Sequence, residues 1–508
     1  MLDSLGEILP RAARLYGDKT ALVFAGREFS FTELDDFSSR LAGGLSGLGI
    51  GAGDIVTLYS ANRWEWVVSY YGVLKLGAVI NPINVMLTPT EVEFVVRDCG
   101  AKAILASGEK GAPILGVKET SDVAEIMLFD DADVANGARS FSELITHNDP
   151  VFDAVAVTRG DMSTICYTSG TTGHPKGAMQ SHESVMMNAA MTAQMHVRTN
   201  ADTIVTALPC PHVYGNVIMN GAMLYGMTLV LHAAFVEDEI LGSIERYRAT
   251  MFEGVPTMYM YLLNNAKLDQ TDLSSLTRCT VGGQTMPVAK MEEVEARFGC
   301  PLIELWGMTE LAGLGTTHPL YGRNVLGSIG IPLPYTEMRI AAVDDAGTTL
   351  PAGEVGELMA RGPLVMQGYY GNDAATNETI EDDGWLHTGD LASMDENGYI
   401  FIVDRKKDLI LTAGYNIYPA ELERVIAGHP AVALVAVGPR ADELKGEIAK
   451  AYIVLKDGVE GDAEDIIAFC RRDLAAYKAP REIQFVEDLP KTSTGKVMRR
   501  ELHTLDAT

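Results

Sequence analysis

The stretch Tyr167-Thr-Ser-Gly-Thr-Thr-Gly-His-Pro-Lys-Gly177 decides how this chain is interpreted. It combines glycines with serine and threonine hydroxyls and carries a lysine near its end. Apolar Ile165 and Cys166 precede it and a helix-prone run from Glu183 to Met195 follows, so we expect a strand, a flexible loop and a helix. Glycines let backbone amides approach an anion, hydroxyls add donors, and a lysine adds a point charge. The stretch is therefore typical of a loop that holds nucleotide phosphates.

The common phosphate loop G-x-x-x-x-G-K-[ST] does not fit this stretch. Counted from Gly170, that pattern needs glycine at position 175, where the chain has Pro175. A polar surface turn is the other interpretation, because glycine, serine and threonine are ordinary turn residues. The length and order of the stretch favour phosphate binding over a turn.

The composition indicates a globular protein of at least two domains. A chain of 508 residues exceeds one ordinary hydrophobic core, and fractions of 47% hydrophobic and 21% charged residues are usual for globular proteins. The net charge of −28 argues against nucleic-acid binding, because a phosphate backbone would be repelled. The same negative charge also repels anionic substrates, so a site for them needs local positive charge. Lys176, Arg405 and Lys496 are the candidates.

Cysteine spacing and the N-terminus predict a cytoplasmic protein. The six cysteines include no C-x-x-C pair, which favours neither a disulfide framework nor a zinc site. The N-terminal residues 1–7 are acidic where a signal peptide needs basic residues. No run of about 18 apolar residues escapes a charge or a helix breaker, so we expect no transmembrane segment.

Strands and helices alternate along the first hundred residues, which indicates an α/β layer architecture. Thr32 to Gly49 is predicted to be an amphipathic helix with Thr32 as its cap. The further elements are a strand at 54–59, a helix at 64–76, a strand at 78–82, a helix near 89–99 and a strand at 101–106.

The stretch at 167–177 resembles the phosphate loop of adenylate-forming enzymes, which include acyl-CoA synthetases, luciferases and the adenylation domains of peptide synthetases. Later segments resemble further motifs of that superfamily in the same order. They are Leu302-Ile-Glu-Leu-Trp-Gly-Met-Thr-Glu310, Gly384-Trp-Leu-His-Thr-Gly-Asp390, the charged run that begins at Asp404, and Leu489-Pro-Lys-Thr-Ser-Thr-Gly-Lys496. The resemblance spans residues 10–500 and points to the acyl-CoA synthetase branch.

The resemblance implies an α/β fold with two domains. A large N-terminal domain over residues 1–404 would contain two α/β subdomains and a small β-barrel subdomain. A smaller, mobile α+β domain over residues 405–508 would rotate about a hinge near Lys407. The charged run after Asp404, between an apolar strand and a new α/β pattern, also has the character of a domain boundary.

Nucleotide-binding residues follow from the same resemblance. Trp306 would stack on adenine, Asp390 would bind the ribose hydroxyls, and Lys496 would reach the substrate carboxylate and the α-phosphate. The implied ATP or AMP site comprises Thr168, Ser169, Gly170, Thr171, Thr172, Lys176, Gly283, Gln284, Leu305, Trp306, Gly307, Met308, Thr309, Asp390, Arg405, Asn416 and Lys496. The implied catalytic residues are Lys496, Glu310, Thr309 and Lys176, and the Mg²⁺ ligands are Glu310 and Thr168.

Acyl and CoA sites are implied in the same way. A strand that ends at Pro209 and Pro211 is expected to expose His212 and Tyr214, although an isolated histidine is more often structural. Arg248 falls where relatives place a basic residue for a CoA phosphate, and a solvated arginine at a helix end is an equal alternative. The acyl set is His212, Tyr214, Asn216, Gly282, Gly283, Met308 and Ala312, and the CoA set is Arg248, Lys407 and Gly414.

The implied activity is that of an AMP-forming carboxylic acid–CoA ligase that uses ATP, Mg²⁺ and coenzyme A. Apolar Val217 and Met219 near the acyl set favour a medium- or long-chain fatty acid, although methionine is often core filler. A hydroxycinnamate or other aryl acid, such as a feruloyl or coumaroyl group, is the second candidate. Two alternatives are an adenylate-forming enzyme that does not use CoA and a non-catalytic nucleotide-binding scaffold. The expected partners are small molecules, and a homodimer is compatible with the sequence.

Overall fold

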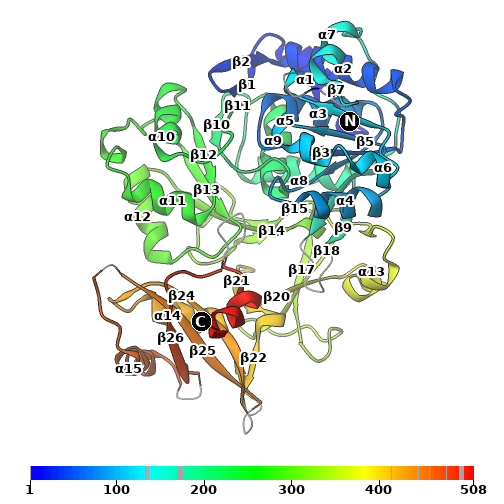
Figure 1. Cartoon of the computed structure of the whole chain (residues 1–508). Coiled ribbons are helices and arrows are strands. Elements are labelled where there is room, and N and C mark those ends of the chain that lie inside the picture. Colours follow the sequence, from blue (N-terminus) through cyan, green and yellow to red (C-terminus); the bar gives the residue numbers. More distant parts are fainter. Residues whose placement is uncertain are drawn as a thin grey trace. The chain divides into compact units, whose positions relative to one another are not determined.

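The computed structural model describes residues 2–131, 134, 137–168, 175–412, 415–442, 446–456, 458–475, 478–490 and 497–507 (Figure 1). The chain divides into two compact units. The first comprises Met1–Glu337 with Ala360–Leu386, and the second Met338–Met359 with His387–Thr508. The predicted hinge near Lys407 stays a prediction, because compactness does not show which segment rotates.

Two large sheets form the framework of the first unit. The nine-stranded sheet has the order β16-β15-β14-β13-β12-β10-β11-β1-β2, and the eight-stranded sheet has the order β19-β9-β8-β4-β3-β5-β6-β7. The strands of the first sheet are β1 (Thr20–Phe24), β2 (Arg27–Ser30), β10 (Thr203–Thr206), β11 (Thr228–Leu231), β12 (Met251–Gly254), β13 (Arg278–Gly282), β14 (Leu302–Met308), β15 (Gly313–Thr317) and β16 (Ile331–Pro332). Those of the second are β3 (Ile55–Tyr59), β4 (Val79–Pro82), β5 (Ala103–Ala106), β6 (Glu125–Leu128), β7 (Arg139–Ser140), β8 (Met162–Thr168), β9 (Lys176–Ser181) and β19 (Gly368–Tyr369).

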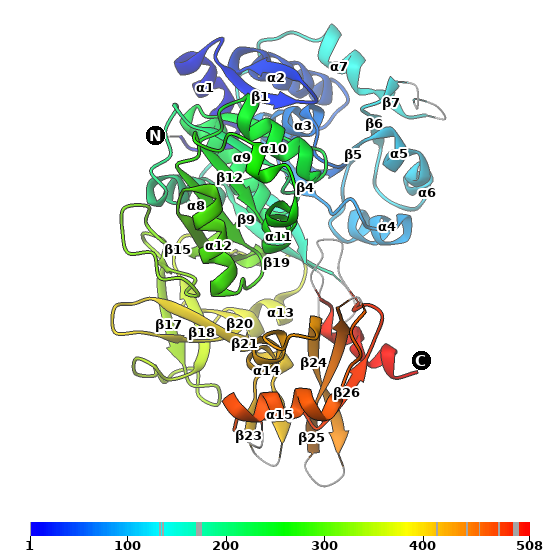
Figure 2. The same cartoon turned by 90° about the vertical axis from the view of Figure 1, so that its left-hand side faces the viewer.

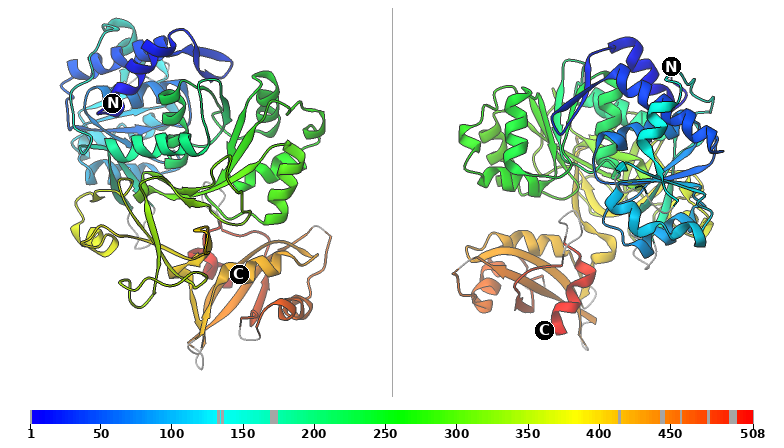
Figure 3. Two further views of the ribbon diagram at one scale, coloured as in Figure 1. Left: turned by 180° about the vertical axis from the view of Figure 1, so that it is seen from behind. Right: turned by 45° about the horizontal axis from the view of Figure 1, so that its top comes forward.

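Helices cover both sheets of this unit, which explains why central strands such as β3 and β13 are buried throughout. Helix α8 contacts β9 of one sheet and β15 of the other, so it lies between the two. Helices α10, α11 and α12 cover the outer face of the nine-stranded sheet, with Phe252, Tyr259 and Phe298 in the shared core (Figures 2 and 3). The helices are α1 (Ile8–Tyr16), α2 (Phe31–Gly47), α3 (Trp64–Lys75), α4 (Pro89–Asp98), α5 (Gly108–Gly111), α6 (Val117–Thr120), α7 (Phe141–His147), α8 (His182–Met195), α9 (Val213–Tyr225), α10 (Glu237–Arg246), α11 (Pro256–Asn264), α12 (Val288–Phe298) and α13 (Asp373–Thr379).

Two local predictions were wrong. The chain does not pass from the glycine-rich loop directly into a helix, because β9 lies between them and pairs antiparallel with β8, with Thr168 opposite Lys176. Lys176 therefore begins a strand. Helix α2 is capped by Ser30 and not by Thr32, because the Ser30 side chain accepts from the Glu33 N–H while the Glu33 carboxylate accepts from the Ser30 N–H.

The second unit contains two smaller sheets. The four-stranded sheet β17-β18-β20-β21 forms the small β subdomain, and Glu337, residues 360–361 and Leu386 at the ends of its strands are grouped with the first unit. The second sheet has the order β23-β22-β25-β24, with β26 paired to β25. The elements are β17 (Glu337–Ala341), β18 (Gly356–Arg361), β20 (Leu386–Met394), β21 (Ile400–Arg405), η6 (Lys406–Asp408), β22 (Ile410–Thr412), β23 (Tyr415–Ile417), α14 (Pro419–Ala427), β24 (Val432–Asp442), β25 (Gly446–Leu455), α15 (Ala463–Asp473), β26 (Glu482–Phe485) and η7 (Arg499–Ala507).

Alternation along β24 and β25 gives the second sheet two apolar faces. Val437 and Ile453 pack with helices α14 and α15, whereas Ala436 and Tyr452 pack with Leu502 of the C-terminal helix η7. Successive side chains of a strand point to opposite faces, so one strand serves both clusters. Within the described residues no helix has the length and apolarity needed to cross a bilayer.

Strand β14 carries a buried carboxylate. Glu304 is 2% exposed, and its Oε2 has no hydrogen-bond partner among the described residues. Burial raises the pKa of the Glu304 carboxyl to about 8, since the ionised form would lose its hydration. The folded protein therefore holds Glu304 protonated at neutral pH, whereas the unfolded chain ionises it.

This difference predicts how stability changes with pH. The pKa of Glu304 is higher in the folded protein than in the unfolded chain. Burial of Glu304 therefore does not lower the free energy of unfolding below the unfolded pKa, and it lowers it increasingly as pH rises toward about 8. Glu304→Gln should raise the free energy of unfolding by about 2–4 kcal/mol at pH 8 and by little at pH 5. Thermal unfolding of both forms across this range measures the effect, with exposed Glu292→Gln as the control. Parallel pH curves for wild type and Glu304→Gln would show that Glu304 is already ionised.

Candidate active site

Strand β9, which follows the predicted phosphate loop in the sequence, is held beside Thr309, and Glu310 is held by a third segment. Gln180 of β9 donates from Nε2 to the Thr309 carbonyl at 2.9 Å. The Met366 N–H donates to the Glu310 carbonyl at 2.8 Å. Strand β19 pairs antiparallel with β9, so Tyr369 lies opposite Ala178. Three distant segments of the chain thus meet at the β8–β9 hairpin, whose residues Ser169, Gly170, Thr171 and Thr172 lie outside the described residues.

A cation, an aromatic ring and a carboxylate form a contiguous cluster here. The Lys176 Nζ lies 5.0 Å from the centroid of the Tyr369 ring. The Tyr369 hydroxyl donates to Glu310 Oε1 at 2.8 Å, and Glu310 is 9% exposed. Burial and then the Glu310 charge raise the pKa of Tyr369, so the phenol remains a donor at physiological pH. Because the hydroxyl binds one carboxylate oxygen, it fixes how Glu310 is oriented.

Tyr369 was missed by the sequence predictions. It lies in Gly368-Tyr-Tyr-Gly371, where both glycines adopt positive φ, +134° and +61°. Such φ values favour glycine, so an aromatic pair enclosed by glycines was the available signal. Nothing in the local sequence, however, places this segment beside a strand nearly two hundred positions earlier.

The ends of β13 and β14 bring the predicted adenine-binding residues together. Gly282 is paired with Leu305, and a Cβ at Gly282 would lie 2.2 Å from Leu305 Cδ1 and 2.9 Å from its carbonyl oxygen. Gly283 follows with φ +88°, and partly exposed Trp306 lies at a bulge in β14. Ligands of α/β sheets commonly bind at the carboxyl ends of parallel strands, which is where Gly283, Gln284 and Trp306 lie.

The prediction that both His212 and Tyr214 are exposed was half wrong. His212 is exposed and caps α9, where its Nδ1 accepts from the Tyr214 N–H at 3.3 Å. Tyr214 is 5% exposed, because the helix begins directly after His212 and turns the ring inward. Its hydroxyl contacts Thr280 Oγ1 at 2.7 Å, and Thr280 donates to Glu253 Oε2 at 2.9 Å. Glu253 in turn pairs with Arg198 at 2.9 Å, and both side chains are almost fully buried.

Helix α9 also packs against the turn that follows Glu310. Ala312 has φ +55°, and Gly313 approaches the helix so closely that a Cβ there would lie 2.4 Å from Val217 Cγ2. Asn216 is 9% exposed and accepts from Asn220 Nδ2 at 2.8 Å. The structure therefore brings α9, with Asn216, to the Ala312 turn, whereas Arg248 is 69% exposed and lies 3.8 Å from Asp272.

The second unit holds the predicted ribose-binding residues. Asp390 and Arg405 lie opposite each other on β20 and β21, and Arg405 Nε pairs with Asp390 Oδ1 at 2.6 Å. The Asp390 side chain is buried, while Arg405 is partly exposed. Lys407 lies in the short helix η6 that follows. Gly414, Lys496 and the side chain of Asn416 lie outside the described residues.

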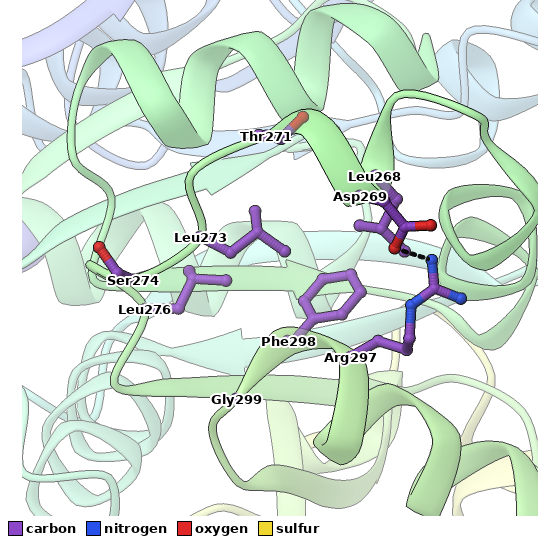
Figure 4. A pocket seen from close by; sticks show the side chains of 9 residues that line it. All are labelled: Leu268, Asp269, Thr271, Leu273, Ser274, Leu276, Arg297, Phe298 and Gly299. Atoms are coloured by element: carbon purple, nitrogen blue, oxygen red, sulfur yellow. Dashed lines mark hydrogen bonds and ion pairs between the residues drawn. The ribbon is translucent and has the colours of Figure 1, made fainter.

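Two surface clefts contain no residue of the predicted sets. One, of about 360 Å³, lies between the loop before β13 and the end of α12, where Arg297 pairs with Asp269 at 2.7 Å (Figure 4). The other, of about 500 Å³, lies at the carboxyl ends of β3 and β5, where Arg63 pairs with Asp130 at 2.9 Å. The arginine in each cleft is paired with a carboxylate.

Among the described residues no cluster of three or more histidine, cysteine or acidic side chains could hold a metal alone.

Comparison with known proteins identifies the family. The sequence model described as "AMP-binding enzyme" matches residues 9–370, and the one described as "AMP-binding enzyme C-terminal domain" matches residues 421–496. The chain is 33% identical over 527 residues to a long-chain-fatty-acid–CoA ligase of Bacillus subtilis (strain 168), with 98% of this chain and 94% of the relative covered. It is 33% identical over 503 residues to a feruloyl-CoA synthase of Amycolatopsis sp., with 98% of each chain covered.

Solved structures agree with this assignment. The anthranilate CoA ligase AuaEII in complex with anthranoyl-AMP superposes with a TM-score of 0.92 at 30% identity, over 99% of this chain and 97% of that chain. ATP-bound MatB from Rhodopseudomonas palustris superposes with a TM-score of 0.92 at 29% identity, over 99% of each chain. This chain therefore belongs to the AMP-binding enzyme family and is an AMP-forming acyl-CoA synthetase of the adenylate-forming superfamily, with ATP and CoA as substrates.

Proposed function

We propose that the protein activates a medium- or long-chain fatty acid with ATP, forming an acyl-adenylate and pyrophosphate, and then transfers the acyl group to CoA. The observation that carries the adenylation step is the cluster of Lys176, Tyr369 and Glu310 beside the predicted phosphate loop. The chain-length class is supported by identity to long-chain-fatty-acid–CoA ligases and by apolar Val217 and Met219 on α9, both almost fully buried.

The first half-reaction joins two anions. The substrate carboxylate attacks the α-phosphorus of ATP, a P–O bond to pyrophosphate breaks, and the acyl-adenylate forms. Each unit charge at about 4 Å contributes about 4 kcal/mol at an effective dielectric near 20. Lys176 supplies one such cation from the first unit, and Lys496 would supply another from the C-terminal part. Catalysis of this kind depends mainly on positioning and electrostatic stabilisation.

Glu310 and Thr168 are proposed to hold Mg²⁺ at the phosphates. The donors fit the metal, because Mg²⁺ in nucleotide sites takes one or two protein oxygens and obtains its other ligands from phosphates and water. Absence of a multi-carboxylate cluster among the described residues is compatible with that coordination. The ion would neutralise phosphate charge, while the Tyr369 hydroxyl orients the Glu310 carboxylate.

The second half-reaction needs a different arrangement of the C-terminal part. The thiol of CoA attacks the acyl carbon, and AMP leaves. A free thiol is a few per cent ionised at neutral pH, so a dedicated base is not required. We propose that residues 405–508 rotate about Lys407 against residues 1–404, which removes Lys496 and brings the loop with Gly414 to the site. Asp390 and Arg405 would keep the ribose bound, and Arg248 would meet a CoA phosphate.

A panel of acids tests the substrate class. Octanoate, dodecanoate and palmitate should each release AMP in a CoA-dependent reaction, with kcat/KM at least about tenfold above that for ferulate, p-coumarate and benzoate. AMP release and thioester formation are measured together. Faster turnover of ferulate would establish the aryl acid alternative, and adenylate formation without CoA consumption would establish an enzyme that does not use CoA.

Substitution at Tyr369 tests the Glu310 cluster. Tyr369→Phe keeps the ring beside Lys176 but removes the hydrogen bond to a charged carboxylate, which is worth about 1.5–3 kcal/mol. Acid-dependent ATP–pyrophosphate exchange should fall roughly tenfold to a hundredfold, with a higher Mg²⁺ requirement. Tyr370→Phe, which removes the hydroxyl of the neighbouring tyrosine, is the matched control. An unchanged exchange rate in Tyr369→Phe would remove Tyr369 from the proposed site.

The two lysines of the C-terminal part test the two-step scheme. Lys496→Ala should abolish ATP–pyrophosphate exchange yet leave thioester formation from supplied acyl-adenylate largely intact. Lys407→Pro should do the reverse, because proline restricts the backbone about which the rotation occurs. Exposed Lys267→Ala is the control for loss of a surface lysine. Equal losses of both half-reactions in both variants would contradict two alternating arrangements.

A further inference from the structure

Asp404 connects the segment before Lys407 to two segments after it. Its side chain is 1% exposed at the end of β21. Its Oδ2 accepts from the Ala420 N–H at 2.7 Å, in the first turn of α14. Its Oδ1 accepts from Arg499 Nη1 at 2.9 Å, at the start of η7. One buried carboxylate thus bridges the backbone position that the proposed rotation would move.

Arg499 is held by two further carboxylates. Its Nη1 donates to Asp408 Oδ2 at 3.0 Å, and its Nε and Nη2 donate to the two oxygens of Glu423 at 3.0 and 2.6 Å. Such charge-assisted, bidentate contacts are the strong class of protein hydrogen bonds and fix the guanidinium plane. The guanidinium is therefore firmly attached to the C-terminal part.

The position of Lys407 divides these contacts into two groups. Asp408 and Glu423 follow Lys407 in the sequence, as Arg499 does, so a rotation about Lys407 leaves their ion pairs intact. Asp404 precedes Lys407, so the same rotation must separate it from both Arg499 and the Ala420 N–H. We propose that Asp404 and Arg499 are positioning residues for the reaction, and that their ion pair holds the C-terminal part in one of the two orientations that the half-reactions need.

This inference rests on the rotation set out under the proposed function. It concerns Lys496 directly, because the chain between Lys496 and Arg499 can span at most about 11 Å. Whatever fixes Arg499 therefore limits where Lys496 can reach. Separating Asp404 from Arg499 and the Ala420 N–H leaves a carboxylate that must regain hydration or find new donors. The ion pair therefore favours the orientation in which it is formed.

A purely structural role makes a different prediction. If the cluster only stabilises the C-terminal part, Asp404→Asn and Asp408→Asn should lower the Tm and both half-reactions to similar extents, since each removes one charged partner of Arg499. The positioning role predicts a difference between them, because only the Asp404 contact crosses Lys407. Asp408→Asn is therefore the matched control.

The enzymatic test compares the two half-reactions in these variants. Asp404→Asn keeps the shape and an oxygen for the Ala420 N–H, but it loses the charge that binds Arg499. Loss of one charge-assisted bond should change the ratio of ATP–pyrophosphate exchange to thioester formation from supplied adenylate by about tenfold, with the two rates moving in opposite directions. Asp408→Asn should leave this ratio within about twofold. The inference is overturned if both variants keep the wild-type ratio or shift it equally.

A distance measurement separates this inference from the proposed function. Spin labels on exposed Glu292→Cys and Glu460→Cys report the orientation of the C-terminal part, because the six native cysteines are buried. We expect two distance populations, whose ratio Asp404→Asn changes in the absence of substrates and Asp408→Asn does not. Populations that respond to ATP and CoA but not to Asp404→Asn would overturn the role of Asp404 alone. One population under every condition would overturn the rotation and this inference together.

Discussion

Repulsion between anions is the constraint on which the rest of this structure depends. The reacting carboxylate and the triphosphate are both negative, and the protein itself carries a net charge of −28. The positive electrostatic potential that binds these anions must therefore come from a few well-positioned cations and not from the protein surface as a whole. Lys176, the first residue of β9 after the predicted phosphate loop, lies against the Tyr369 ring, and the hydroxyl of Tyr369 restrains the carboxylate of Glu310. The two sheets serve to bring these groups from distant segments to one place.

Several cations of the second unit are paired with carboxylates and order the structure around them. In the second unit Arg405 is matched to Asp390, and Arg499 is surrounded by three carboxylates. A cation paired with a carboxylate contributes little potential at a distant anion, because the two fields oppose each other and salt screens the remainder beyond about a Debye length. Arg499 thus orders the fold of the second unit, whereas Lys176 is proposed to act on the nucleotide.

Much of the fold could be predicted from the sequence, because its signals are local. Short apolar runs near glycines predicted β3 and β5, and the apolar period of the segment 64–76 predicted helix α3. Errors arose where a local signal had a close competitor. Thr32 is a good cap residue, but Ser30 has Glu33 three positions on, and that reciprocal pair is stronger.

The site was harder to predict than the motifs that mark it. Residue order made Thr309, Glu310 and Asp390 site candidates, since turn glycines and chemically distinctive side chains can be recognised in the sequence alone. Tyr369 was not visible, because its role depends on β19 joining a sheet from far along the chain. Tyr214 was misplaced because a preceding pair of prolines suggests a loop, whereas the helix starts immediately after them. A distant strand pairing decided the first case, and the start of helix α9 decided the second.

The buried series Tyr214, Thr280, Glu253 and Arg198 has an implication for how such an enzyme could acquire new substrates. The phenol hydroxyl contacts Thr280, which donates to the Glu253 carboxylate, and this carboxylate is paired with the equally enclosed guanidinium of Arg198. A smaller side chain at position 214 would create room but would also leave polar groups without partners in a dry interior. With Tyr214 in the proposed acyl set, enlarging the pocket by that route would require concerted replacement of several interior residues, so a wider substrate range would be coupled to the stability of the fold.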